Sequence, residues 1–148
     1  MPTYTCSALA GRLTPVAKRD IANAITAVHH ETTGAPTFFA QVLFADIAPE
    51  NYFVGGVPLR SDQIFVRGEI RAGRSAKDKH NLISRLIQAV CEAAGMLPAC
   101  VWVYIAELPA KHMAEFGHIL PEPGGEGRWM DELPPADRKR MLGIGTHA

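Results

Sequence analysis

The second residue of the chain is a proline, and a proline at an N-terminus is an unusual acid–base group. Met1 precedes Pro2, and the initiator methionine is usually removed before a small second residue. Removal would leave a secondary amine, which can accept or donate a proton during catalysis. The alternative is that Pro2 only governs N-terminal processing. If Met1 stays in place, the Pro2 nitrogen is an amide and this chemistry is impossible.

Two arginines form a second candidate group. Arg71 and Arg74 lie in the segment IRAGRS (70–75), between a predicted strand end and a predicted helix start. Ligands of open α/β sheets bind at the carboxyl ends of strands, and two guanidinium groups there can hold one carboxylate in bidentate geometry. Alternatively, each arginine pairs separately with a surface acid such as Glu69 or Asp78.

Three further side chains have types suited to acid–base chemistry. His29 lies on the apolar side of a predicted helix near its C-terminus, where the helix dipole favours a charged imidazole. Tyr104 lies in a predicted strand and Glu115 in the loop-like stretch after it, and such a pair can position and deprotonate a water molecule. The plainer interpretation is a core histidine, a core tyrosine and a surface glutamate. The adjacent His29 and His30 are a poor chelate, because only residues three or four apart share a helix face, so no metal site is predicted.

A repeat of strand, helix and strand would position these residues. Thr14 and Ser75 are predicted helix N-caps, Gly34 and Gly95 are predicted helix ends, and both pairs share one offset in the sequence, from i to i+61. The same offset places the first strand-like segment on the third. The four strand-like segments are TYTCSAL (3–9), FFAQVLFADI (38–47), IFVRGEI (64–70) and VWVYIAEL (101–108). Two such β-α-β units side by side predict an α/β fold, with a four-stranded sheet and both helices on one face.

We expect a single domain over residues 1–148, with four consecutive parts. These are a first β-α-β unit (2–50), a connector with turn residues (51–62), a second β-α-β unit (63–108) and a C-terminal extension (109–148). In the extension, residues 120–129 are turn-rich and residues 134–142 are predicted to form a short helix. The sheet face without helices is predicted to be buried in an oligomer.

Composition excludes several classes of protein. The chain has 148 residues, of which 47% are apolar and 20% charged, so it is expected to be folded. Its formal net charge is zero, which argues against nucleic-acid binding. The longest apolar run, 99–106, is far shorter than the roughly 20 residues that cross a membrane, and no signal-peptide pattern begins the chain. The cysteines Cys6, Cys91 and Cys100 lack CxxC spacing and are expected to be free thiols, which favours a cytoplasmic location.

Taken together, these features resemble the tautomerase superfamily, named for 4-oxalocrotonate tautomerase. Within it, the chain is similar to the cis-3-chloroacrylic acid dehalogenase group, whose members fuse two β-α-β units. The similarity spans nearly the whole chain, through RLTPVAK, AITAVHH, IFVRGEIRAGRS, VWVYIAELPA, residues 113–115 and GEGRWMDEL. Two departures are SALAG (7–11), where a polar segment is expected, and Phe116, where the group often has tyrosine.

The resemblance implies the tautomerase fold and a homotrimer that needs no cofactor or metal. It implies the catalytic residues Pro2, His29, Arg71, Arg74, Tyr104 and Glu115. His29 and the two arginines would bind the carboxylate of a cis-3-haloacrylate, Glu115 and Tyr104 would activate water, and Pro2 would protonate C2. The products would be halide and malonate semialdehyde, and related unsaturated acids would be hydrated.

Two alternatives remain open at this point. A keto–enol tautomerase of a 2-oxo acid such as phenylpyruvate would need Pro2 and an arginine, but not Glu115. A trimeric binding protein with a vestigial site would need no catalytic residue. In each enzyme interpretation the expected partner is a small carboxylic acid, and neither nucleic acid nor a membrane is expected.

Overall fold

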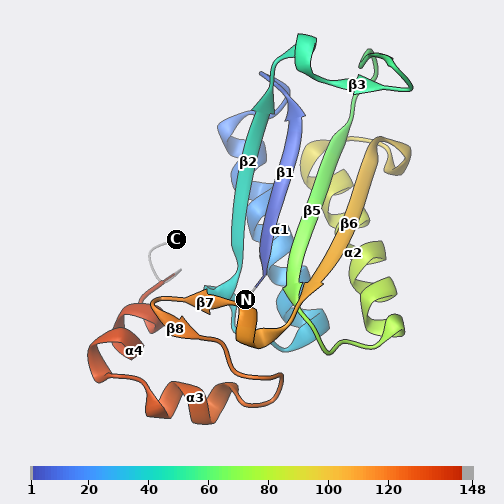
Figure 1. The fold of residues 1–148 in the computed structure, drawn as a ribbon. Helices are drawn as coiled ribbons and strands as arrows, with labels where there is room; N and C mark the ends of the chain where they lie inside the picture. Colours follow the sequence, from blue (N-terminus) through green and yellow to red (C-terminus); the bar gives the residue numbers. More distant parts are fainter. Residues whose placement is uncertain (1, 145–148) are drawn as a thin grey trace.

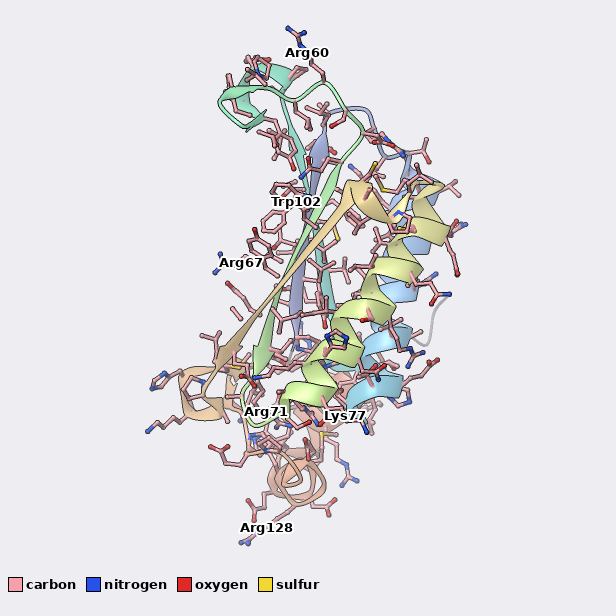
Figure 2. All side chains as sticks on the ribbon, turned by 90° about the vertical axis from the view of Figure 1, so that its right-hand side faces the viewer. Arg60, Arg67, Arg71, Lys77, Trp102 and Arg128 are labelled. Atoms are coloured by element: carbon pink, nitrogen blue, oxygen red, sulfur yellow. The ribbon has the colours of Figure 1, made fainter. Side chains whose placement is uncertain are left out.

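The computed structural model describes residues 2–144 and contains a four-stranded sheet in the order β2-β1-β5-β6 (Figure 1). The strands are β1 (Thr3–Leu9), β2 (Gln41–Ile47), β5 (Ile64–Arg71) and β6 (Val101–Leu108). The helices α1 (Pro15–Thr33) and α2 (Ala76–Ala94) cover one face of this sheet (Figure 2). β1 is parallel to β2, β5 is parallel to β6, and β1 and β5 are antiparallel. The predicted fold of two β-α-β units is confirmed.

Both long helices begin and end at the predicted residues. The hydroxyl of Thr14 accepts a hydrogen bond from the Ala17 backbone N–H at 3.1 Å, and the Ser75 hydroxyl accepts one from Asp78 at the same distance. Each helix ends at a glycine in the left-handed conformation, Gly34 with φ 72° and Gly95 with φ 64°. These local signals fix where each helix stops and the next strand starts.

The core lies between the sheet and the two helices. Its fully buried side chains include Tyr4, Cys6, Ile21, Ile25, Ile64, Val66, Ile70, Leu82, Leu86 and Val90. The Tyr4 ring lies over Gly68 of β5, and a Cβ at Gly68 would come within 2.5 Å of that ring. Gly68 therefore makes room for a buried tyrosine that reaches the helix layer.

The first strands of the two units, β1 and β5, are related by an offset one residue larger than the predicted one. Thr3 pairs with Gln41, and Phe65 pairs with Trp102. Gln41 and Trp102 keep the predicted offset, so Thr3 is equivalent to Phe65 and not to Ile64. An error of one residue exchanges the two faces of a strand, and the predicted offset placed buried Tyr4 on Phe65 of the opposite face. The difference arises because the first unit has one more residue between its first strand and its helix. Five residues separate β1 from α1, whereas four separate β5 from α2.

Smaller elements complete the chain. The connector contains the hairpin of β3 (Phe53–Val54) and β4 (Val57–Pro58), and the extension contains β7 (Ala114–Glu115), β8 (His118–Ile119), α3 (Glu126–Glu132) and α4 (Pro135–Leu142). Short 3₁₀ helices cover Thr37–Phe39, Pro49–Asn51, Pro98–Cys100 and Ala110–His112. The predicted terminal helix is α4, whereas α3 begins inside the segment predicted to consist of turns. A second apolar cluster holds the extension in place, and it contains Phe38, Phe39, Met113, Leu120 and Trp129.

The sheet face opposite the helices carries large exposed side chains. Arg67 and Trp102 project from this face (Figure 2), and Leu43 and Tyr104 are also exposed. The ring of Phe65 contacts that of Tyr104, with centroids 5.0 Å apart. Among residues 2–144, no helix is long and apolar enough to cross a membrane.

Candidate active site

Pro2 lies buried at the start of β1, beside the end of β5. Its carbonyl oxygen accepts a hydrogen bond from the Gln41 backbone N–H at 3.0 Å, and its side chain is fully buried. Because Thr3 pairs with Glu69 in the antiparallel register, Pro2 lies next to Ile70. The first residue of the predicted catalytic set is thus adjacent to the strand end that carries the arginines.

His29 lies in the last turns of α1, where it is buried and contacts Tyr4. The Tyr4 hydroxyl and the Nδ1 atom of His29 are 2.8 Å apart. Burial, together with the charges of Arg74 and Arg71, lowers the pKa of His29 to about 4, so the imidazole is neutral near pH 7. Burial also raises the pKa of Tyr4, which therefore keeps its proton. For His29, the effect of desolvation, which favours the neutral imidazole, thus exceeds that of the helix dipole, which favours the charged form.

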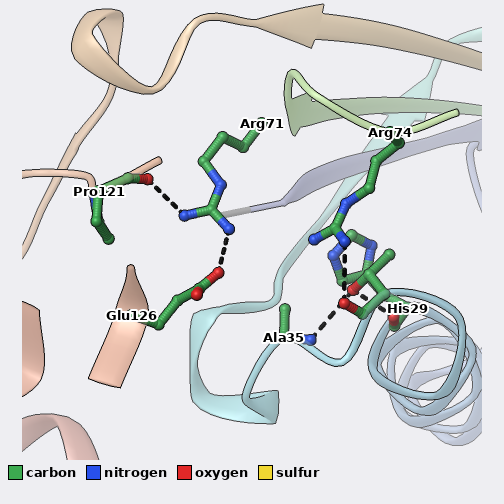
Figure 3. Close-up of polar contacts among 7 residues, drawn as sticks. His29, Ala35, Arg71, Arg74, Pro121 and Glu126 are labelled. Carbon is green, nitrogen blue, oxygen red and sulfur yellow. Dashed lines mark hydrogen bonds and ion pairs between the residues drawn. The ribbon is translucent and has the colours of Figure 1, made fainter. Parts of the chain in front are cut away.

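Arg71 ends β5 and is enclosed by the C-terminal extension, with a relative exposure of 3%. Its Nη1 donates to the Pro121 carbonyl oxygen at 2.6 Å, and its Nη2 pairs with the Glu126 carboxylate (Figure 3). Arg74 precedes α2, and its Nη1 donates to the Thr33 carbonyl oxygen at 3.1 Å. Neither of the two acids considered from the sequence, Glu69 and Asp78, is the partner found for these guanidinium groups.

Both guanidinium groups and the His29 imidazole line one small cavity, together with Ala35 and Ile70. The volume of this cavity is about 10 Å³, close to the space that one water molecule occupies. A neutral imidazole and two guanidinium groups around a small cavity can bind an anion. A substrate larger than water requires a local opening, and Arg74 is only partly buried.

Glu115 and Tyr104 lie away from that cavity. Glu115 ends β7, in a hairpin whose turn places Phe116 (φ 55°) and Gly117 (φ 85°) in the left-handed region. Glu115 lines a separate, larger cavity of about 680 Å³, which Thr3 and Glu69 also border. Tyr104 is 59% exposed on the open face of the sheet. Within one chain, the structure therefore brings His29, Arg71 and Arg74 together beside Pro2, but it does not place Glu115 or Tyr104 with them.

Two residues at this site were not found by sequence reasoning. Tyr4 could have been suspected, because a tyrosine on the core face of a strand needs a hydrogen-bond partner. Glu126 offers no such signal, since it lies in a polar, glycine-rich segment far along the chain from Arg71. Within the described part of the chain, no group of three His, Cys, Asp or Glu side chains is placed to hold a metal ion.

Comparisons with known proteins identify the family of the chain. Residues 1–132 match the family described as "Putative oxalocrotonate tautomerase enzyme". The crystal structure of N1, described as a member of the cis-3-chloroacrylic acid dehalogenase family, is 30% identical with a TM-score of 0.91, covering 95% of this chain and 98% of that chain. The structure of Ps01740 is 28% identical with a TM-score of 0.71, covering 76% and 99% of the two chains.

A third structure supports the fold alone. It is described as a "Q0 fused 4-OT wild type symmetric trimer" and is 24% identical with a TM-score of 0.73, covering 83% of this chain and 98% of that chain. A search of the curated proteins by sequence gave no match. The chain belongs to the tautomerase superfamily and is similar in structure to a member of the cis-3-chloroacrylic acid dehalogenase group. It is an enzyme of that superfamily.

Proposed function

We propose that the mature protein begins at Pro2 and catalyses hydrolytic dehalogenation of a cis-3-haloacrylate without a cofactor. The observation that carries the proposal is the cavity at which Arg71, Arg74 and a neutral His29 meet beside Pro2. A small carboxylate matches these groups, because guanidinium donors form strong charge-assisted hydrogen bonds with it. The dehalogenase family of the N1 relative supports the choice of substrate.

The carboxylate would be held from three sides. Arg74 can exchange its carbonyl partner for a substrate oxygen, and Arg71 contributes its remaining donor. With the Tyr4 hydroxyl donating to Nδ1 of His29, the imidazole proton resides on Nε2 and can donate to the same carboxylate. This binding draws electron density away from C3 and prepares that carbon for attack by water.

The reaction then needs one base and one acid. Glu115, with Tyr104, takes a proton from water while the water oxygen forms a bond to C3, and the Pro2 ammonium protonates C2. The resulting halohydrin loses halide and a proton and gives malonate semialdehyde. Water therefore supplies the oxygen of the new aldehyde, and no oxidant is consumed.

Tyr104 can take part only if it comes from another subunit. It is exposed on the open sheet face, roughly 13 Å along β6 from Leu108, which borders the Glu115 cavity. The uncovered aromatic and aliphatic side chains of that face favour a homotrimer in which the partner subunit's Tyr104 approaches Glu115. Trimeric relatives such as the Q0 fused 4-OT are consistent with this assembly.

A keto–enol tautomerase acting on a 2-oxo acid such as phenylpyruvate is the second candidate. The observation that favours it is the separation of Glu115 from the cavity lined by the arginines. Tautomerisation needs a proton shuttle and a carboxylate-binding arginine, which Pro2 and Arg74 supply. It does not need an activated water.

Product identification by proton NMR with cis-3-chloroacrylate and an enol substrate separates the two candidates. Glu115→Gln removes the base, so dehalogenation should fall by about 10²–10⁴ while ketonisation changes little. Glu69→Gln is the matched control, because Glu69 borders the same cavity and pairs with Arg67. Equal losses of both reactions in Glu115→Gln would contradict the dehalogenase assignment.

The N-terminus has its own test. Pro2→Ala replaces a secondary amine by a primary one and should remove most activity with little change in folding. Intact mass spectrometry of the wild type should show a chain that starts at Pro2. Full activity in protein that retains Met1 would refute the role of the Pro2 amine.

A further inference from the structure

The guanidinium group of Arg71 has its orientation fixed by the C-terminal extension. One terminal nitrogen donates to the Pro121 carbonyl oxygen at 2.6 Å, and the other pairs with the Glu126 carboxylate at the start of α3. Figure 3 shows Pro121 on one side of this side chain, and Arg74 and His29 on the other. The two terminal nitrogens are therefore already engaged by the protein.

The Nε atom of Arg71 is the donor left over. Among residues 2–144 it is buried and has no hydrogen-bond partner. A buried N–H without an acceptor is costly and is usually satisfied by a water molecule or a ligand. Arg71 lines the small cavity together with Arg74 and His29, so one oxygen of a bound anion can satisfy this donor.

The net charge of the groups around the cavity balances the charge of one carboxylate. His29 is neutral near pH 7, since its pKa lies at about 4. Burial raises the pKa of Glu126, but the hydrogen bond and charge of Arg71 outweigh it, and the net effect lowers that pKa. Glu126 is thus ionised and neutralises Arg71. Within the described chain, the partner found for Arg74 is an uncharged carbonyl group.

We propose that Glu126 is a specificity-determining residue that, by neutralising Arg71, restricts the site to substrates with one carboxylate. The proposal rests on the carboxylate-binding site of the proposed function. A second carboxylate would lie at a site where the charge of Arg71 is already compensated, so no unpaired cation would offset the cost of desolvating it. Glu126 acts through Arg71 and does not touch the reacting atoms.

The test compares two acids that differ in one group. Maleate carries a carboxylate where cis-2-butenoate carries a methyl group on the same alkene. Isothermal titration calorimetry, with both maleate carboxyls ionised, measures their dissociation constants for the wild type, Glu126→Gln and Glu122→Gln. Glu122 is an exposed neighbour on the same segment, so its substitution changes the net charge equally without touching Arg71.

The wild type should bind cis-2-butenoate at least about tenfold more tightly than maleate. Glu126→Gln keeps a hydrogen-bond acceptor but removes the charge, so this preference should shrink by about tenfold. Glu122→Gln should keep the wild-type preference. The ratio of two affinities measured on one protein sample cancels any difference in the folded fraction.

Three results would overturn the proposal. In the first, the preference is unchanged in Glu126→Gln. In the second, both acids bind more tightly to Glu126→Gln by the same factor, which means that Glu126 weakens the binding of every carboxylate and does not discriminate between them. The third needs the wild type alone and is maleate binding as tight as that of cis-2-butenoate. By contrast, unchanged binding of cis-2-butenoate to Arg74→Ala would remove the carboxylate site itself, and the proposed function with it.

Discussion

The two ends of the sheet are built from equivalent positions of the two β-α-β units, but these positions hold polar side chains at only one end. At the end where β1 begins, the chain places Pro2, His29, Arg71 and Arg74. The equivalent positions at the other end hold Ile64, Val90, Leu9 and Leu13. Ile64 and Val90 are fully buried and Leu13 is nearly so. We call the first the reactive end, after its proposed function, and the second the inert end.

The difference shows what a polar end requires. The aliphatic side chains at these positions of the inert end need only packing, whereas a buried guanidinium or imidazole needs partners. Those partners are the Tyr4 hydroxyl for His29, and Pro121 and Glu126 for Arg71. Val66 stands where a second copy of Tyr4 would be, so the second unit lacks the corresponding hydroxyl group. The extension likewise has one copy, and it covers only the reactive end (Figure 1).

Removing a charge from the reactive end should have the largest effect. Arg74→Ala should lower kcat/KM for a cis-3-haloacrylate by about 10²–10³, because it deletes a cation that binds the carboxylate and stabilises the developing charge. Part of this loss should appear in kcat. Leu13→Ala, at the equivalent position of the inert end, should instead lower the melting temperature and keep the activity per folded molecule.

Arg128→Ala is the surface control, since this side chain is 87% exposed and pairs with Glu132 of the same helix. It should leave both activity and stability near wild type. If Arg74→Ala merely destabilised the protein, as Leu13→Ala is expected to do, the two ends would not differ in function.

Introducing the reactive residue into the inert end is the next largest perturbation. Val90→His places an imidazole in a fully buried position without the hydroxyl that Tyr4 gives to His29. It should lower the free energy of unfolding by about 2–3 kcal/mol, measured by urea denaturation. In the wild type, the absence of a side chain at Gly68 makes room for the Tyr4 ring. Adding Val66→Tyr to Val90→His should therefore restore stability only if the new ring has a similar space.

The pH dependence of stability should come from the reactive end. His29 has a folded-state pKa of about 4 and an unfolded value of 6.5, so between these values the unfolded chain binds the extra proton. Stability is fully present above about pH 6.5 and is lost as the pH falls towards 4. The loss is about 3 kcal/mol. His29→Gln should flatten this part of the curve, and an unchanged slope would contradict a neutral buried imidazole.

The smallest effects should come from a pair of repeated ion pairs. Lys18 binds Asp46 at 2.8 Å, and Lys79, at the equivalent place of the second unit, binds Glu107 at 2.6 Å. Both pairs are partly exposed, so Lys18→Met and Lys79→Met should each cost less than about 1 kcal/mol. Thermal melts at low and high salt check this. A much larger loss of stability for one of the two variants would show that the two ion pairs are not equivalent.

Local signals were sufficient to predict most of the fold. The N-caps Thr14 and Ser75 and the terminal glycines Gly34 and Gly95 act within a few residues, and all four are where they were expected. The strand offset was wrong by one residue, because apolar residues such as Phe65 occur on both faces of β5. Burial and pairing decide the register there, and neither is visible in the sequence.

The candidate site was less accessible to prediction. His29, Arg71 and Arg74 could be proposed from their places at element ends, and the structure brings them together. Their roles, and those of Pro2, Tyr104 and Glu115, stay predictions. Glu126 could not be found, since a contact between a strand end and a glycine-rich segment much later in the chain has no local pattern.

The contact between Arg71 and Glu126 also sets the order in which the protein can become functional. The ribosome delivers Arg71 at the end of β5, the first strand of the second unit, and its carboxylate partner emerges 55 residues later, after β6 has completed that unit. Until then the sheet can pair while the guanidinium remains in water, and non-local contacts of this kind form late because they close long loops. The site is therefore assembled last, and ligand binding reports the completion of folding rather than the presence of the sheet.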